Sequence, residues 1–182
     1  MKVIAGIALL ALLFSAAALA QTSPEIEKAL AAAPAQMKDA ATVIKWKPDF
    51  TYDTLRKGTN KLVCYERPIQ PGQQPFSVEC TSLANLERVA VSLKTEMMIP
   101  DAAARRTAFE ELEKAGKWPK PEFGSVFYNM TGANQATARL HATISVPGAT
   151  GASMGLPENA DKGGAWIMNA GTSAAHLMTP GH

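Results

Sequence analysis

The two cysteines, Cys64 and Cys80, constrain the fold of this chain more than any other feature. The segment between them is rich in residues that break regular structure: Pro68, Pro71, Gly72 and Pro75. Such a segment cannot hold a helix or a strand and gains from a covalent link. In an oxidising compartment an isolated cysteine pair forms a disulfide, which stabilises a loop of this size by about 3 kcal/mol. A metal site would need a further Cys or a nearby His to complete its ligand set, so we predict a Cys64–Cys80 disulfide.

The first twenty residues predict that compartment, because they follow the pattern of a cleavable export signal. Lys2 precedes an almost continuously apolar core at 3–14, and small residues follow it. Ala18 and Ala20 occupy the two small-residue positions of an Ala-x-Ala cleavage site. An uncleaved membrane anchor, the alternative, needs about 20 predominantly apolar residues, more than this core has. We expect residues 1–20 to be a signal peptide and the mature protein to be periplasmic or secreted, with no stable membrane span after cleavage.

Size and charge indicate one domain without an electrostatic target. Residues 21–182 have the length of a single globular domain with its own core. The chain holds 18 Lys and Arg against 16 Asp and Glu, and removal of Lys2 with the signal would leave a formal charge of +1. A chain so balanced has no electrostatic reason to bind nucleic acid or an anionic membrane. No motif specifies a cofactor.

Apolar residues recur at helical spacing in three places. The first helix begins at Ser23, which precedes a proline and an acidic residue, and Pro34 should kink it or split it in two. A second helix is predicted over 83–97, capped by Thr81 or Ser82. Asp101 caps a third, which ends at Gly116 and whose charged side reads as a solvated face.

Strand patterns occupy the remaining chain and decide the fold class. They fall at 42–46, 50–56, 61–65, 76–78, 123–130, 137–146, 165–168 and 174–178. The segment 137–146 alternates apolar and polar residues, and 76–78 is expected to be a short edge strand. Helices at the front and centre, with strands gathered late, predict an α+β fold. The N-terminal and central helices should pack on a mostly antiparallel sheet.

Histidines and methionines near the C-terminus are the candidate ligand-binding residues. His141 lies on the polar side of its strand, where a surface or cleft position is expected, and His182 is the last residue. His176 lies among small and apolar residues, so a hydrogen-bonded, half-buried histidine is the plainest interpretation. If neighbouring strands brought His141 and His176 together, imidazole and the nearby methionine thioethers would suit copper. Methionines at strand positions are, however, ordinarily part of the core.

Nucleophilic catalysis finds little support in the sequence. Ser173 lies in Gly-Thr-Ser-Ala rather than in a Gly-x-Ser-x-Gly elbow. A Ser173, His176 and Asp161 set can be written down, but such triads are recognised by geometry rather than by sequence. No glycine-rich stretch has the spacing of a phosphate-binding loop. The chain therefore carries no pattern that identifies an enzyme.

Three stretches carry a resemblance to a known family. They are Leu-Arg-Lys-Gly-Thr-Asn at 55–60 leading to Cys64, a second cysteine that opens a helix as Cys80 does, and a tail with Gly-Gly-Ala-Trp-Ile-Met at 163–168 and Ala-His-Leu-Met at 175–178. With these, the chain resembles a family of uncharacterised exported bacterial proteins from Ile26 to its end. Members often have Pro at the position of Ala165, Pro-Tyr at 173–174 and Gly-Pro at 139–140, where this chain differs. The resemblance implies export, a bacterial origin and a single domain, but no activity.

These observations favour an exported binding domain over an enzyme. Binding sites gather where polar and aromatic side chains lie at strand ends on a rigid sheet. The expected cleft is lined by His141, His176, Trp166, Met168 and Met178, and its ligand is an unknown small molecule or protein. The alternatives are a copper-type metal site using His141, His176 and methionine, and, less favoured, a hydrolase.

Overall fold

Eight strands form one mostly antiparallel sheet in the computed structural model, which describes residues 23–179. The strands are β1 (Thr42–Trp46), β2 (Tyr52–Arg56), β3 (Leu62–Glu66), β4 (Phe76–Ser82), β5 (Val126–Gly132), β6 (Arg139–Ser145), β7 (Trp166–Met168) and β8 (His176–Met178). They lie in the order β2-β1-β3-β4-β5-β6-β8-β7, and only β1 and β3 pair in parallel. The predicted α+β class with a mostly antiparallel sheet is confirmed.

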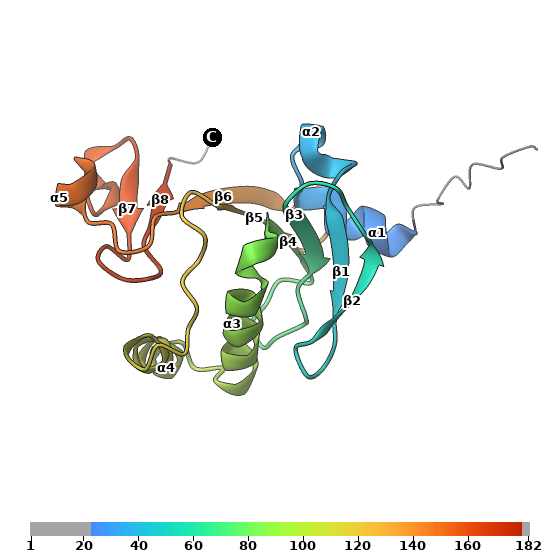
Figure 1. Ribbon diagram of the computed structural model, residues 1–182, viewed down its shortest axis with the longest axis horizontal. Coiled ribbons are helices and arrows are strands. Elements are labelled where there is room, and N and C mark those ends of the chain that lie inside the picture. The colour runs from blue at the N-terminus through green and yellow to red at the C-terminus, as the bar shows by residue number, and fades with distance from the viewer. Residues whose placement is uncertain (1–22, 180–182) are drawn as a thin grey trace, which may run out of the picture.

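Helices cover both faces of this sheet (Figure 1). They are α1 (Pro24–Ala29), α2 (Ala35–Lys38), α3 (Leu86–Met98), α4 (Ala102–Lys114) and α5 (Gly151–Met154), with 3-10 turns at Leu30–Ala32, Leu83–Asn85 and Ala160–Lys162. The predicted caps are confirmed, since Ser23 accepts from the N–H of Ile26 and Asp101 from that of Ala104. The predicted break at Pro34 is also found, between the 3-10 turn and α2. No helix within 23–179 is long and apolar enough to cross a membrane. The predicted signal peptide at 1–20 and His182 lie outside the described residues.

The centre of the sheet is the β3–β4 pair, which the predicted disulfide joins. Cys64 lies directly opposite Cys80 in the register, with their Cα atoms 4.1 Å apart, and the two sulfurs are bonded. The expected short edge strand at 76–78 is wrong. β4 extends to Ser82 and lies between β3 and β5, and every residue from Phe76 to Thr81 is buried. Two helical layers explain this, because they bury the polar as well as the apolar side of the strand.

Each face of the central strands belongs to a separate apolar core. On one face the α1 region packs on residues that include Val43, Cys64 and Val78. On the other face α3 places Leu86, Val89 and Leu93 against residues of β1 and β3: Ile44, Trp46, Val63 and Tyr65. The alternation of side chains along a strand produces this division. A third, smaller core joins Val146, Ile167 and Ala175 near the C-terminus.

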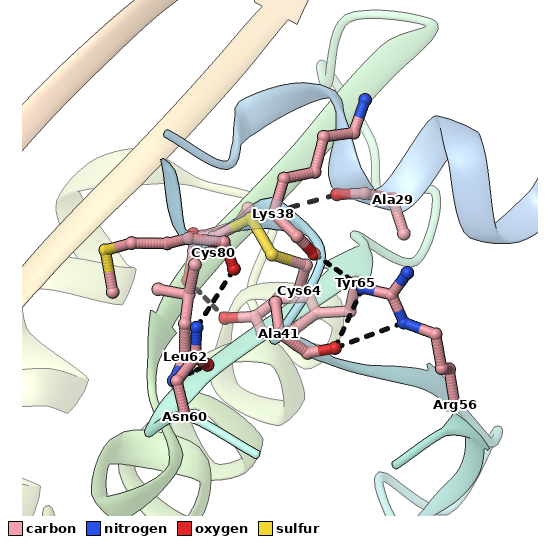
Figure 2. Close-up of a disulfide and its surroundings, with 11 residues drawn as sticks. Ala29, Lys38, Ala41, Arg56, Asn60, Leu62, Cys64, Tyr65 and Cys80 are labelled. Carbon is pink, nitrogen blue, oxygen red and sulfur yellow. Dashed lines mark hydrogen bonds between the residues drawn. A yellow bond between two sulfur atoms is a disulfide. The ribbon is translucent and has the colours of Figure 1, made fainter. Parts of the chain in front are cut away.

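The Leu55–Asn60 motif locks α2 against the start of β1 (Figure 2). Arg56 donates through Nε and Nη2 to the carbonyl of Ala41 and through Nη2 to that of Lys38. Asn60 donates to the Met37 carbonyl. Gly58 passes so close to this segment that an added Cβ would lie 2.3 Å from the Ala40 carbonyl oxygen. The glycine is therefore required by a close approach of backbones, which lets the chain cross from β2 to β3.

The apolar side of β6 stays open. Its alternation is as the sequence predicts, but Leu140 is 56% exposed and Ile144 38% exposed, because no helix covers this face beyond the α1–α2 region. Only Ser145, at the C-terminal end of β6, is buried. The sequence pattern therefore predicts the strand correctly, whereas the burial of its side chains depends on which helical layer covers it.

We predict that reduction of the Cys64–Cys80 bond lowers the free energy of unfolding by about 3 kcal/mol, because the bond restricts the unfolded chain. The measurement is urea unfolding with and without dithiothreitol. The double variant Cys64→Ala/Cys80→Ala is the control and should not respond to the reductant. An unchanged midpoint in wild-type protein whose thiols are demonstrably free would contradict the prediction.

Candidate functional site

A cavity of about 190 Å³ lies on the α3 face of the sheet, between the start of α3, the segment after α4 and the C-terminal strands. It is lined by Arg88, Trp118, Pro121, Phe127, Ser145, Asn169, Ala174, Ala175 and His176, and we call it the Arg88 cavity. These residues come from four separate parts of the chain. They combine one cation and one imidazole with aromatic and small side chains, and no acidic residue is among them.

Arg88 is buried in α3, with 6% of its surface exposed. Its guanidinium lies flat on the indole of Trp118, with Cζ 3.6 Å from the ring centroid. Nη1 donates to the carbonyl of Pro119 at 2.6 Å and to Oγ of Ser173 at 3.3 Å. Within residues 23–179, Nε and Nη2 have no hydrogen-bond partner. The side chain therefore keeps Nε and Nη2 free of acceptors among the described residues.

The charge of Arg88 is not matched by a carboxylate. No acidic side chain in the described part of the chain lies within 4.0 Å of its guanidinium. Burial lowers the pKa of Arg88 to about 10, and the more distant charge of Glu113 opposes this shift. Arg88 is still a cation at neutral pH. Burying a cation without an ion-paired carboxylate is costly, which makes the arrangement a candidate for function.

A second, half-buried arginine nearby shows the opposite arrangement. Arg67 donates to Glu79 at 3.1 Å and to Glu96 at 2.5 Å, and Tyr65 donates its hydroxyl to Glu79. Burial raises the pKa of Glu79, and Arg67 and Tyr65 oppose this. Burial alone would lower the pKa of Arg67, but the two carboxylates raise it. This charge cluster is paired internally, so it reads as part of the structure.

The cluster is adjacent to the Arg88 cavity. Arg67, Glu79 and Glu96 line a small cavity of about 180 Å³ that also contacts Arg88 and Phe127. Arg88 thus lies between a compartment that holds Glu79, Glu96 and Arg67 and one without acids. Any ligand anion would encounter less repulsion on the His176 side.

The C-terminal strands place four of the candidate residues on the face that carries the cavity. His176 pairs with Ser145 of β6 and Met168 of β7, and Met178 pairs with Trp166. Paired residues of antiparallel strands share a face. Of these four, His176 lines the cavity; its Nδ1 donates to the Ala174 carbonyl at 2.8 Å, which leaves Nε2 for another partner. Met168 is 41% exposed.

The register does not bring His141 to His176. Because His176 lies opposite Ser145, His141 is four residues further along β6, about 13 Å away on the same face. His141 is exposed. The described residues hold no cluster of three or more His, Cys, Asp or Glu side chains that could bind a metal ion. His141 and His176 are therefore too far apart to bind the same copper ion, as the copper-type site would require.

Ser173, His176 and Asp161, the possible catalytic triad, are not connected by hydrogen bonds within the described chain either. Ser173 is buried, accepts from Arg88 and has no hydrogen bond to His176. The hydrogen bond that orients His176 goes to a backbone carbonyl, whereas Asp161 is exposed in the Ala160–Lys162 turn. Within the described chain no carboxylate is hydrogen-bonded to His176 as a catalytic orienter would be.

No sequence pattern indicates Arg88 or Trp118 directly. Arg88 sits between Glu87 and Val89 in a helix where a charged residue normally faces water. Trp118 lies after α4 in a segment without regular structure, where its Nε1 donates to Ser92 and its ring stacks on Phe109 at 4.5 Å. Only the fold shows that the two side chains meet. Helical spacing gives one indirect indication that Arg88 and Trp118 are close. Arg88 lies one turn from Ser92 on the same side of α3, and Ser92 accepts from Trp118.

No protein-family model, curated protein or solved structure matches this chain significantly. The resemblance to exported bacterial proteins stays a prediction. What the site can do is therefore inferred from its own geometry.

We predict that Glu79→Ala destabilises the protein by about 3–5 kcal/mol, because it leaves the Arg67 charge and the Tyr65 hydroxyl buried with one partner fewer. Chemical unfolding would measure this difference. The exposed ion pair of Lys45 and Glu25, 2.8 Å apart, provides the control. Lys45→Ala should leave the free energy of unfolding almost unchanged. If the two substitutions changed the free energy of unfolding equally, the stabilising role of the Glu79 contacts with Arg67 and Tyr65 would be refuted.

Proposed function

We propose that this protein is an exported binding domain for a small organic anion, which it holds in the Arg88 cavity. The observation that carries the proposal is Arg88 itself: a buried cation with two free donor atoms and, among residues 23–179, no carboxylate within ion-pair distance. A carboxylate or similar anion would accept from Nε and Nη2 in the bidentate geometry that guanidinium favours.

The other lining residues favour an organic ligand of modest size. Trp118, Pro121 and Phe127 offer apolar surface, while Ser145, Asn169 and His176 offer polar atoms. A mostly apolar wall with a few placed polar groups is the usual composition of a small-molecule site. The cavity volume of about 190 Å³ is below the range typical of drug-sized ligands, so a small carboxylate fits better than a large one.

Export is supported by the disulfide and by the N-terminal pattern. Disulfides persist in oxidising compartments, and both cysteines of this chain are joined in one. An exported binding domain of this kind would meet its ligand in the periplasm or outside the cell. Retention of residues 1–20 in protein recovered from the cell envelope, measured by intact mass, would contradict export without affecting the anion site.

We predict that small anions raise the melting temperature of the wild-type protein. A panel of acetate, benzoate, succinate, phosphate and sulfate, compared with chloride at equal ionic strength, identifies the preferred class, because a ligand that binds only the folded state stabilises it. Benzoate and uncharged benzamide form a matched pair. We expect benzoate to bind at least tenfold more tightly in calorimetric titration. Equal binding of the two, or no stabilising anion in the panel, would overturn the proposal.

Two arginine variants test whether Arg88 binds the anion. Arg88→Met should weaken binding of the stabilising anion at least tenfold. Arg56→Met is the matched control, since Arg56 also donates to backbone carbonyls, those of Lys38 and Ala41, but lines no part of the Arg88 cavity. It should retain binding even if it unfolds at a lower temperature. Binding by Arg88→Met at the wild-type level would refute the assigned role.

A further inference from the structure

A separate groove of about 610 Å³ lies between α3 and α4. Its α3 wall is formed by Val91, Lys94, Thr95 and Met98, and these positions follow the three- and four-residue spacing of one helix face. Figure 1 shows α3 in side view and α4 nearly end-on, so the two helices cross and diverge from the short connection that joins them. The groove occupies the space between them.

The α4 wall has the same spacing, and no other part of residues 23–179 buries it. Ala108, Glu111, Leu112 and Ala115 line the groove, yet α4 contains no buried residue. The sequence predicts an apolar stripe for this helix, and such a stripe normally packs on a core. Here Leu112 and Ala108 are half-buried at the groove, and Met98 opposite is 70% exposed. An apolar surface thus remains available to a partner.

Charge and size restrict what that partner can be. Lys94 and Lys117 are both exposed at the groove, and Glu111 is the one acidic residue among its lining side chains. The walls extend over eight residues, about 12 Å at the helical rise. A single unbranched alkyl chain is narrow enough to lie along this groove. The lysine excess favours an anionic head.

We propose that the α3–α4 groove binds a single-chain amphiphile with an anionic head group, such as a medium-chain fatty acid. The alkyl chain lies against Val91, Leu112 and Met98, and the carboxylate lies near Lys117 and Lys94. This groove and the Arg88 cavity have no lining residue in common. The groove is therefore a second site, independent of the proposed function.

The test is displacement of a fluorescent dansyl-undecanoate by decanoate, measured on the mature chain. Ala108→Trp fills the groove and should weaken decanoate binding at least tenfold. Ala103→Trp, the same substitution at an exposed position of α4 outside the groove, should bind as the wild type does. Met98→Glu gives a second test at a side chain exposed enough to tolerate the change, and it should also weaken decanoate binding. Wild-type binding by both groove variants would overturn the proposal.

The head group and the site are tested separately. Lys117→Glu should weaken decanoate at least fivefold and leave decanol unchanged, and wild-type protein should prefer decanoate. Arg88→Met should leave decanoate binding intact. If decanol binds as tightly as decanoate, the anionic head is refuted. If Arg88→Met abolishes binding while Ala108→Trp does not, the chain occupies the Arg88 cavity and the groove proposal fails.

Discussion

The disulfide-linked pair of central strands is the constraint on which the rest of the structure depends. Cys64 and Cys80 face each other across β3 and β4, and both strands are buried on both faces. The α1 region covers one face and α3 the other. Because α3 follows β4 after a single 3-10 turn, the pair also fixes where Arg88 emerges. A proline-rich loop between the cysteines could not supply this order by itself, and the covalent link compensates for it.

Arg67 and Arg88, both on the α3 face of the sheet, lie in different electrostatic environments. Arg67 is enclosed by Glu79 and Glu96, so its charge is neutralised within the protein. Among the described residues, Arg88 contacts a carbonyl, a hydroxyl and the face of an indole, and the charge of Glu113 acts on it from further away. In an interior of low dielectric these contacts offset part of the desolvation of a cation, and a carboxylate would offset more. The difference between the two environments, rather than the presence of either arginine, distinguishes a structural cluster from a site.

The sequence predicted the local elements well and their burial less well. Ser23, Pro34 and Asp101 marked helix boundaries because capping and proline geometry act within a few residues. β4 was mistaken for an edge strand because Ser77, Glu79 and Thr81 are polar, and nothing local shows that α3 buries them. His141 and His176 lie on one face, yet the register between β6 and β8 separates them. Register and layer depend on contacts between distant segments, so Arg88 and Trp118 could be brought together only by the fold.

Arg56 provides the comparison that decides how Arg88 should be understood. Both arginines hold backbone carbonyls in place, and Arg56 uses Nε and Nη2 for this while staying half-exposed, so little desolvation opposes it. Arg88 holds the Pro119 carbonyl through Nη1 alone, and its Nε and Nη2 have no partner among the described residues. If its only role were to position the segment that carries Trp118, an apolar side chain packed on the indole would fill the space without burying a charge. An arginine in this place is favoured when an anion shares its charge, which is the condition that the Arg88 cavity is suited to meet.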